Sequence, residues 1–180
     1  MSQCDRLIRR MEKTREMSEK MLAAFESPED WCHQAVPGTN HALWFAGHMA
    51  MTDNYFIGRV APGSEKQFDG WDKLFGMGSK PTNNPDDYPP VAEVLDTMRE
   101  RRGALVEVLK GRSDVELTGP PAAGASDFLP DLASVYEMTP WHEALHLGQV
   151  TVVRRALGNR PLFDPAPAEA CTRRRPLGQP

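Results

Sequence analysis

Apolar residues recur at helical spacing in four separate stretches of this chain, and proline and glycine separate the stretches. The stretches cover about residues 4–25, 40–58, 90–110 and 131–157. Apolar side chains three and four residues apart lie on one face of an α-helix, so each stretch predicts a helix with one buried face. Such helices bury these faces against one another. We therefore predict an all-α protein, a four-helix bundle with a long irregular connection between its second and third helices.

Capping and breaking residues set the expected ends of these helices. Asn40 has a side chain suited to capping the start of the second helix. Gly111 and Gly158 are expected to end the third and the fourth. Pro140 falls inside the last stretch and leaves two readings open, because a proline either kinks a helix or stands at the first position of a new one.

The connection over residues 60–90 is rich in proline and glycine and carries Phe68, Trp71 and Phe75. A connection of this length inside a compact domain is uncommon and is often functional. We predict that its aromatic side chains pack over one end of the bundle, with a short helical turn near residues 72–75.

The chain has 180 residues, which suits one domain with one core. We predict a single domain over residues 1–160 and a tail rich in proline and arginine over residues 161–180. No apolar run approaches the roughly 20 residues that span a bilayer, and the first residues lead directly into a charged amphipathic segment. These features predict a cytoplasmic protein that does not bind membranes. The net charge of −4 gives no reason to expect nucleic acid as a partner.

Three of the five histidines lie in apolar, helix-forming surroundings. His142 and His146 are four residues apart, so both side chains leave the same face of the expected last helix. His48 lies on the expected second helix. Three imidazoles from two neighbouring helices are a ligand set that transition metals accept, with coordination positions left open. The sequence therefore predicts a metal site formed by these three residues.

Other side chains share helical faces with the three histidines and are expected to line a pocket around the metal. They are Trp44, Met51, Thr52 and Tyr55 on the second helix and Met138 and Gln149 on the last. A histidine on an apolar face is also a common hydrogen-bonded core residue. The metal hypothesis therefore depends on the combination of His48 with the later pair.

Residues 142–146 also match the H-E-x-x-H pattern of zinc peptidases, in which the glutamate is the general base. Glu143 is accordingly the candidate catalytic residue, and its alternative is an ordinary solvated helix residue. The extended form of the pattern needs glycine and histidine where this chain has Gln149 and Val152. Downstream, Glu169 is the only glutamate, and it lies outside any expected helix. A peptidase is therefore the less favoured hypothesis.

Two segments together resemble the DinB superfamily. They are GHMAMTDNY at residues 47–55 and WHEALHLGQVTVVRRALG at residues 141–158, and the resemblance extends over residues 1–160. It implies a four-helix bundle, usually a dimer, with a metal held by the three histidines at the matching positions. The long second connection and the tail depart from the family pattern, so pocket shape and substrate do not carry over.

A site of three neutral imidazoles would let a metal activate a water molecule or a thiol at neutral pH. Zinc and nickel are the metals we expect first, and iron and manganese also accept such ligands. The predicted function is a metal-dependent enzyme, a hydrolase or a thiol-dependent transferase, acting on a small molecule, with a low-molecular-weight thiol as candidate cosubstrate. A non-catalytic metal-binding or stress-response protein is the alternative. Ile8 and Met17, on the flanks of the first helix, add to the expectation of a homodimer.

Overall fold

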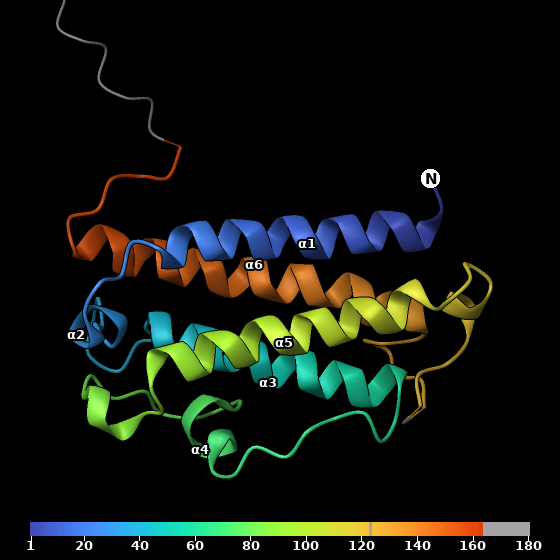
Figure 1. Cartoon of the computed structure of the whole chain (residues 1–180), viewed down its shortest axis with the longest axis horizontal. Coiled ribbons are helices and arrows are strands. Elements are labelled where there is room, and N and C mark those ends of the chain that lie inside the picture. Colours follow the sequence, from blue (N-terminus) through green and yellow to red (C-terminus); the bar gives the residue numbers. More distant parts are fainter. Residues whose placement is uncertain (123, 164–180) are drawn as a thin grey trace, which may run out of the picture.

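Four long helices lie side by side and make up most of the computed structural model, which describes residues 1–122 and 124–163 (Figure 1). The long helices are α1 (Gln3–Leu22), α3 (Ala42–Val60), α5 (Val91–Lys110) and α6 (Leu132–Ala156). Short helices in the connections are α2 (Pro28–Trp31), α4 (Trp71–Phe75), η1 (Pro85–Asp87) and η2 (Glu116–Thr118). The described residues form no strand, so the predicted all-α helical bundle is confirmed.

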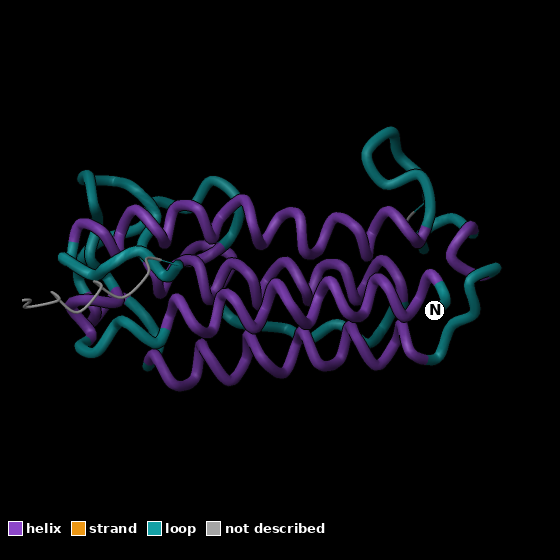
Figure 2. Tube along the Cα trace, turned by 90° about the horizontal axis from the view of Figure 1, so that it is seen from above, coloured by secondary structure: helices purple, strands orange, loops and turns teal. Residues whose placement is uncertain are grey.

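The long helices pack as a closed ring rather than as a flat layer. Helix α1 packs against α5 and α6, and α3 packs against the same two helices. Figure 2 shows the long helices running nearly parallel to one axis, with most of the irregular connections gathered at the two ends. The predicted tail begins at residue 161, and residues 164–180 lie outside the described part of the chain.

The helix ends follow the sequence with four corrections. Helix α1 ends at Leu22, before the predicted end at residue 25, although Phe25 is still buried. Ser27 then caps the short helix α2, which was not predicted. Helix α3 continues to Val60, two residues beyond its predicted end.

The cap of α3 is the fourth correction. His41, and not Asn40, caps the helix, because its Nδ1 accepts a hydrogen bond of 3.1 Å from the backbone N–H of Trp44. An imidazole nitrogen with a lone pair serves the helix end as a carboxylate or amide oxygen does. The amide of Asn40 is thereby left free to reach α6.

Helix α6 runs without a break through Pro140, so no new helix begins at this proline. Asp131 caps it by accepting from the backbone N–H of Ser134 at 2.8 Å. The hydroxyl of Thr139, the residue directly before the proline, donates to the carbonyl oxygen of Val135 at 3.0 Å. A single helix therefore carries both His142 and His146.

The buried apolar residues form two clusters along the bundle. The first cluster lies near α2 and α4 and includes Phe45, Met49 and Phe75. The second cluster lies near η2 and includes Ile57 and Tyr136. Four buried charged residues lie between the two clusters, one on each long helix.

We call these four residues the charge layer. They are Arg15 of α1, Asp53 of α3, Arg102 of α5 and Glu143 of α6. Along α5, for example, Arg102 follows Met98 of the first cluster and precedes Leu105 of the second. None of the first three was predicted to be buried, and Glu143 was expected to be either a general base or a solvated residue. Its side chain is 0% exposed, so the solvated reading was wrong.

Each guanidinium of the charge layer contacts both carboxylates. Arg15 reaches Glu143 at 2.8 Å and Asp53 at 3.0 Å, and Arg102 reaches the same two residues at 2.8 and 2.9 Å. The hydroxyl of Ser18 donates to Glu143 at 2.7 Å. Burial by itself raises the pKa of Glu143, but the two arginines outweigh it and hold that pKa below its usual range. The layer therefore holds two positive and two negative charges.

Candidate metal centre

His48 of α3 meets His142 and His146 of α6 at the contact between these two helices. One ring nitrogen from each of the three lies within 4.8 Å of the others. The ring centroids are 4.6 to 5.1 Å apart. The fold therefore brings together the three histidines that the sequence predicts as metal ligands, and we call them the histidine cluster.

His48 is held by contacts on two sides. Its Nδ1 lies 2.7 Å from the backbone carbonyl oxygen of Phe75, and the ring of Trp44 stacks on its face with centroids 4.4 Å apart. A carbonyl oxygen only accepts, so Nδ1 carries the proton and Nε2 keeps its lone pair. Metal-binding histidines typically donate their second nitrogen in this way.

Gly47 is the residue that allows Phe75 to come so close to α3. A Cβ atom at position 47 would lie 2.3 Å from the Phe75 ring, nearer than any real contact. Phe75 is the last residue of α4, and Trp71 and Phe75 are both buried, which confirms the predicted packing of these aromatics and the short helix near residues 72–75. The long connection thus supplies the acceptor for His48, and a side chain at position 47 would displace it.

His146 has a corresponding partner on its own helix. Its Nδ1 lies 3.2 Å from Oε1 of Gln149, and the same oxygen accepts from the side-chain amide of Asn40 at 3.0 Å. Because an amide oxygen accepts only, Nδ1 of His146 carries the proton and Nε2 presents a lone pair. Gln149, which the sequence placed at the pocket wall, is thus in contact with a candidate ligand.

The spacing of the nitrogens fits a shared metal ion. Nε2 of His142 lies 3.2 Å from Nε2 of His146. Two nitrogens bonded to one ion at about 2.1 Å, at roughly tetrahedral or right angles, lie about 3.0 to 3.4 Å apart. Nδ1 of His142 is buried and has no hydrogen-bond partner among the described residues. The donor set is therefore suited to a divalent transition metal.

Burial keeps two of the imidazoles neutral. It lowers the pKa of His48 to about 4, an effect that nearby His146 reinforces. Burial likewise lowers the pKa of His142 to about 4, reinforced by His146 and then by His48. A histidine ligates through a neutral imidazole. Both residues therefore present lone pairs rather than protons at neutral pH.

The comparison with protein families gives one match. A family model described as the DinB superfamily matches residues 10–150. The chain belongs to the DinB superfamily. No curated protein and no solved structure matches the chain. Membership bears out the resemblance seen in the two sequence segments, while reaction and substrate are not given by it.

Among the helices that the structure describes, none has both the length and the apolar character needed to cross a membrane.

The other residues expected around the metal of this DinB protein lie in different places. Trp44 contacts both His48 and His146. Met51 and Tyr55 line a hollow of about 680 Å³ beside residues 65–72. Tyr55 is 57% exposed, because the inward stripe of α3 turns away from it. Thr52 is half-buried, and Met138 packs against the second apolar cluster.

Glu143 follows His142 in the chain, but its side chain points into the charge layer. Both carboxylate oxygens are engaged with guanidinium groups, Oε1 with Arg15 and Oε2 with Arg102. A general base needs a lone pair within reach of the substrate proton. These contacts favour a structural role, and the assignment of Glu143 as a catalytic base stays a prediction.

Proposed function

We propose that this DinB protein is a metal-dependent enzyme that acts on a small molecule through the histidine cluster. The observation that carries the proposal is the number of ligands. In the described part of the chain, the cluster contains three histidines and no fourth histidine, cysteine or carboxylate. Structural zinc sites are typically closed by four protein ligands, whereas catalytic sites keep a position open.

Each residue of the site has a separate task in this proposal. His48, His142 and His146 would hold the metal, while the Phe75 carbonyl and Gln149 fix the orientation of two of the rings. A divalent metal supplies Lewis acidity, which activates a water molecule or a thiol at neutral pH. Zinc and nickel are the metals proposed first, and iron and manganese accept the same ligands.

The proposed reactions are hydrolysis and thiol-dependent transfer, with a low-molecular-weight thiol as cosubstrate. His142 and His146 are half-buried rather than sealed, which supports access by a small molecule. A peptidase is not supported, because the described residues form no substrate-binding sheet and the glutamate of the H-E-x-x-H match lies in the charge layer. A non-catalytic metal-binding or stress-response protein is the alternative, and a fourth ligand would favour it.

Activity of the metal-loaded protein tests the proposal. We expect turnover of p-nitrophenyl acetate, or of 1-chloro-2,4-dinitrobenzene in the presence of a thiol such as cysteine, once zinc or nickel is bound. His142→Ala should abolish turnover, and Val115→Ala, at an exposed site before η2, should leave it unchanged. A metal-loaded protein inactive in both assays would support the non-catalytic alternative.

We also propose a homodimer, on different residues from those the sequence indicated. Ile8 and Met17 are partly buried, because they pack against the apolar clusters. Trp141 and Leu145 of α6 are instead 56% and 55% exposed, one turn apart on the same face. A two-fold contact between the α6 helices of two copies would bury them. Light scattering should give twice the chain mass, and a monomer mass at micromolar concentration would contradict the dimer.

A further inference from the structure

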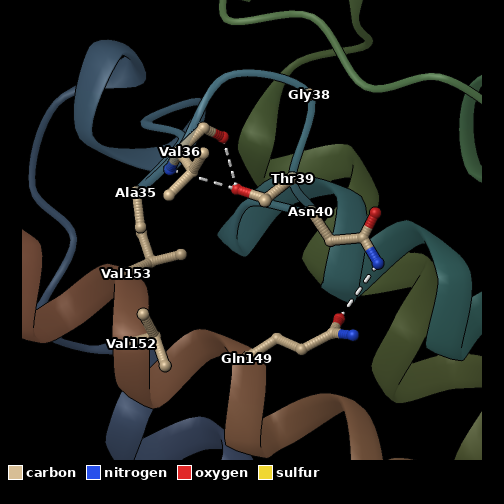
Figure 3. A pocket seen from close by; sticks show the side chains of 8 residues that line it. All are labelled: Ala35, Val36, Gly38, Thr39, Asn40, Gln149, Val152 and Val153. Carbon is tan, nitrogen blue, oxygen red and sulfur yellow. Dashed lines mark hydrogen bonds between the residues drawn. The ribbon is translucent and has the colours of Figure 1, made fainter.

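A pocket of about 410 Å³ lies between the segment that precedes α3 and the last turns of α6 (Figure 3). One wall is formed by residues within 35–40, and the other by Gln149, Val152 and Val153. The histidines of the cluster do not line it, although Gln149 contacts one of them. Its volume falls within the range of about 300 to 1,000 Å³ that is typical of small-molecule sites.

The side chains of this pocket select for a neutral ligand. Its apolar surface comes from three valines and an alanine, and its polar groups are one hydroxyl and two amides. No charged side chain lines it. A charged ligand would therefore lose water without gaining a counter-charge, which is unfavourable. A molecule with a short aliphatic body and an uncharged polar head fits this surface.

The two amides define the polar head more closely. Figure 3 shows the side chains of Asn40 and Gln149 meeting at the edge of the pocket, where the Asn40 amide donates to Oε1 of Gln149 at 3.0 Å. Oε1 also accepts from His146, so its two lone pairs are in use. Within the described part of the chain, no hydrogen bond uses Nε2 of Gln149 or Oδ1 of Asn40. These two groups lie at opposite ends of the bonded amide pair, as Figure 3 shows. Nε2 of Gln149 is therefore available to donate to the carbonyl oxygen of a ligand amide.

We propose that this pocket binds the amide-bearing aliphatic end of the small-molecule substrate and that Gln149 connects its occupancy to the metal centre. The inference rests on the proposed function, because it assigns a subsite to the same enzyme. A ligand amide that bonds to Gln149 shifts the one side chain that holds Nδ1 of His146. Ligand binding and metal geometry are then coupled through a single hydrogen bond, and coupling of this kind acts in both directions.

Titration of the metal-free, full-length protein with N-isobutylacetamide tests the pocket by itself. With ¹³C-labelled valine methyl groups, we expect the signals of Val152 and Val153 to shift, with a Kd on the order of 1 mM for so small a ligand. Val36→Trp, at an exposed position of the pocket wall, should raise the Kd at least about 10-fold by filling the space. Val115→Trp, at an exposed valine remote from the pocket lining, is the matched control and should leave the Kd unchanged.

Two results of this titration would overturn the proposal. One is the absence of binding, or equal binding in the wild type and Val36→Trp. The other is equally strong binding of isobutylammonium, because a cation should find no counter-charge in the pocket. Since no metal is present, the titration succeeds or fails independently of any turnover. An active enzyme that does not bind the amide would refute the subsite alone. An inactive protein that binds the amide would refute the proposed function and, with it, the assignment of the ligand as part of a substrate.

Co²⁺-loaded protein tests whether a ligand in the pocket changes the coordination of the metal. We expect the amide to change the visible absorption spectrum of bound Co²⁺ in the wild type and in Val115→Trp. In Val36→Trp, the same amide concentration should leave the spectrum as it was. An unchanged spectrum in wild-type protein saturated with the amide would refute the role of Gln149 as the connecting residue.

Discussion

Replacing His48, His142 or His146 with alanine is expected to lower the affinity of the protein for its metal by more than about 100-fold. Loss of a residue that merely orients a ligand typically costs 10- to 100-fold in metal affinity. Loss of a ligand itself should cost more, because two imidazoles remain for an ion that needs at least three firm ligands. Metal content after dialysis and calorimetric titration with Zn²⁺ measure the effect.

His33→Ala is the matched control, because this histidine lies outside the cluster. It should leave both the affinity and the stoichiometry of about one ion per chain unchanged. Full metal occupancy in the triple alanine variant would refute the metal site. Circular dichroism of each variant separates loss of the ligand from loss of the fold.

Acid should produce the same loss of metal without any substitution. Burial lowers the pKa of His48 and of His142 to about 4, so protons compete for these two ligands only at low pH. Because a protonated imidazole cannot ligate, protonation of His48 and His142 is expected to abolish metal binding as the pH drops towards about 4. Metal binding that persists well below pH 4 would contradict a site that depends on these two imidazoles.

Periodicity predicted the four long helices because the apolar stripes carry the packing of the bundle. It also predicted the histidine cluster, since a spacing of four residues fixes one helix face whatever surrounds it. The cap of α3 was wrong for a local reason. Asn40 and His41 can each accept a backbone hydrogen bond, and the contact between Asn40 and Gln149 across 109 residues decides between them.

The apolar periodicity could not predict which groups form hydrogen bonds or ion pairs with the site residues. His48 is oriented by a backbone carbonyl of Phe75, and a carbonyl has no sequence signature. In the sequence, Gly47 is the one residue that indicates the close contact between Phe75 and α3. The charge layer was missed because a charged residue on an amphipathic helix is ordinarily counted as solvent-facing. Arg102 occupies the stripe position between Met98 and Leu105, and this interruption is the signal that could have revealed it.

The charge layer gives the second large expected effect, a loss of stability in Asp53→Asn. The substitution keeps the shape of the side chain but leaves Arg15 and Arg102 with a single carboxylate in the core. Removing one partner of a buried ion pair costs about 3–5 kcal/mol, because the remaining charge is uncompensated. Urea unfolding measures the free energy. Glu107→Gln, at an exposed ion pair on α5, is the control and should change it little.

Glu143→Gln tests the same layer and separates its structural role from a catalytic one. Arg15 and Arg102 again lose a carboxylate, so a loss of stability similar to that of Asp53→Asn is expected. Metal should still bind, because the carboxylate belongs to the charge layer and not to the histidine cluster. If the residue were a general base, turnover of the folded, metal-loaded variant would fall by about 10²–10⁴. We expect a small change in turnover instead, since both carboxylate oxygens are bound by guanidinium groups. Unchanged stability with lost turnover would show that Glu143 is a catalytic base and not a structural residue.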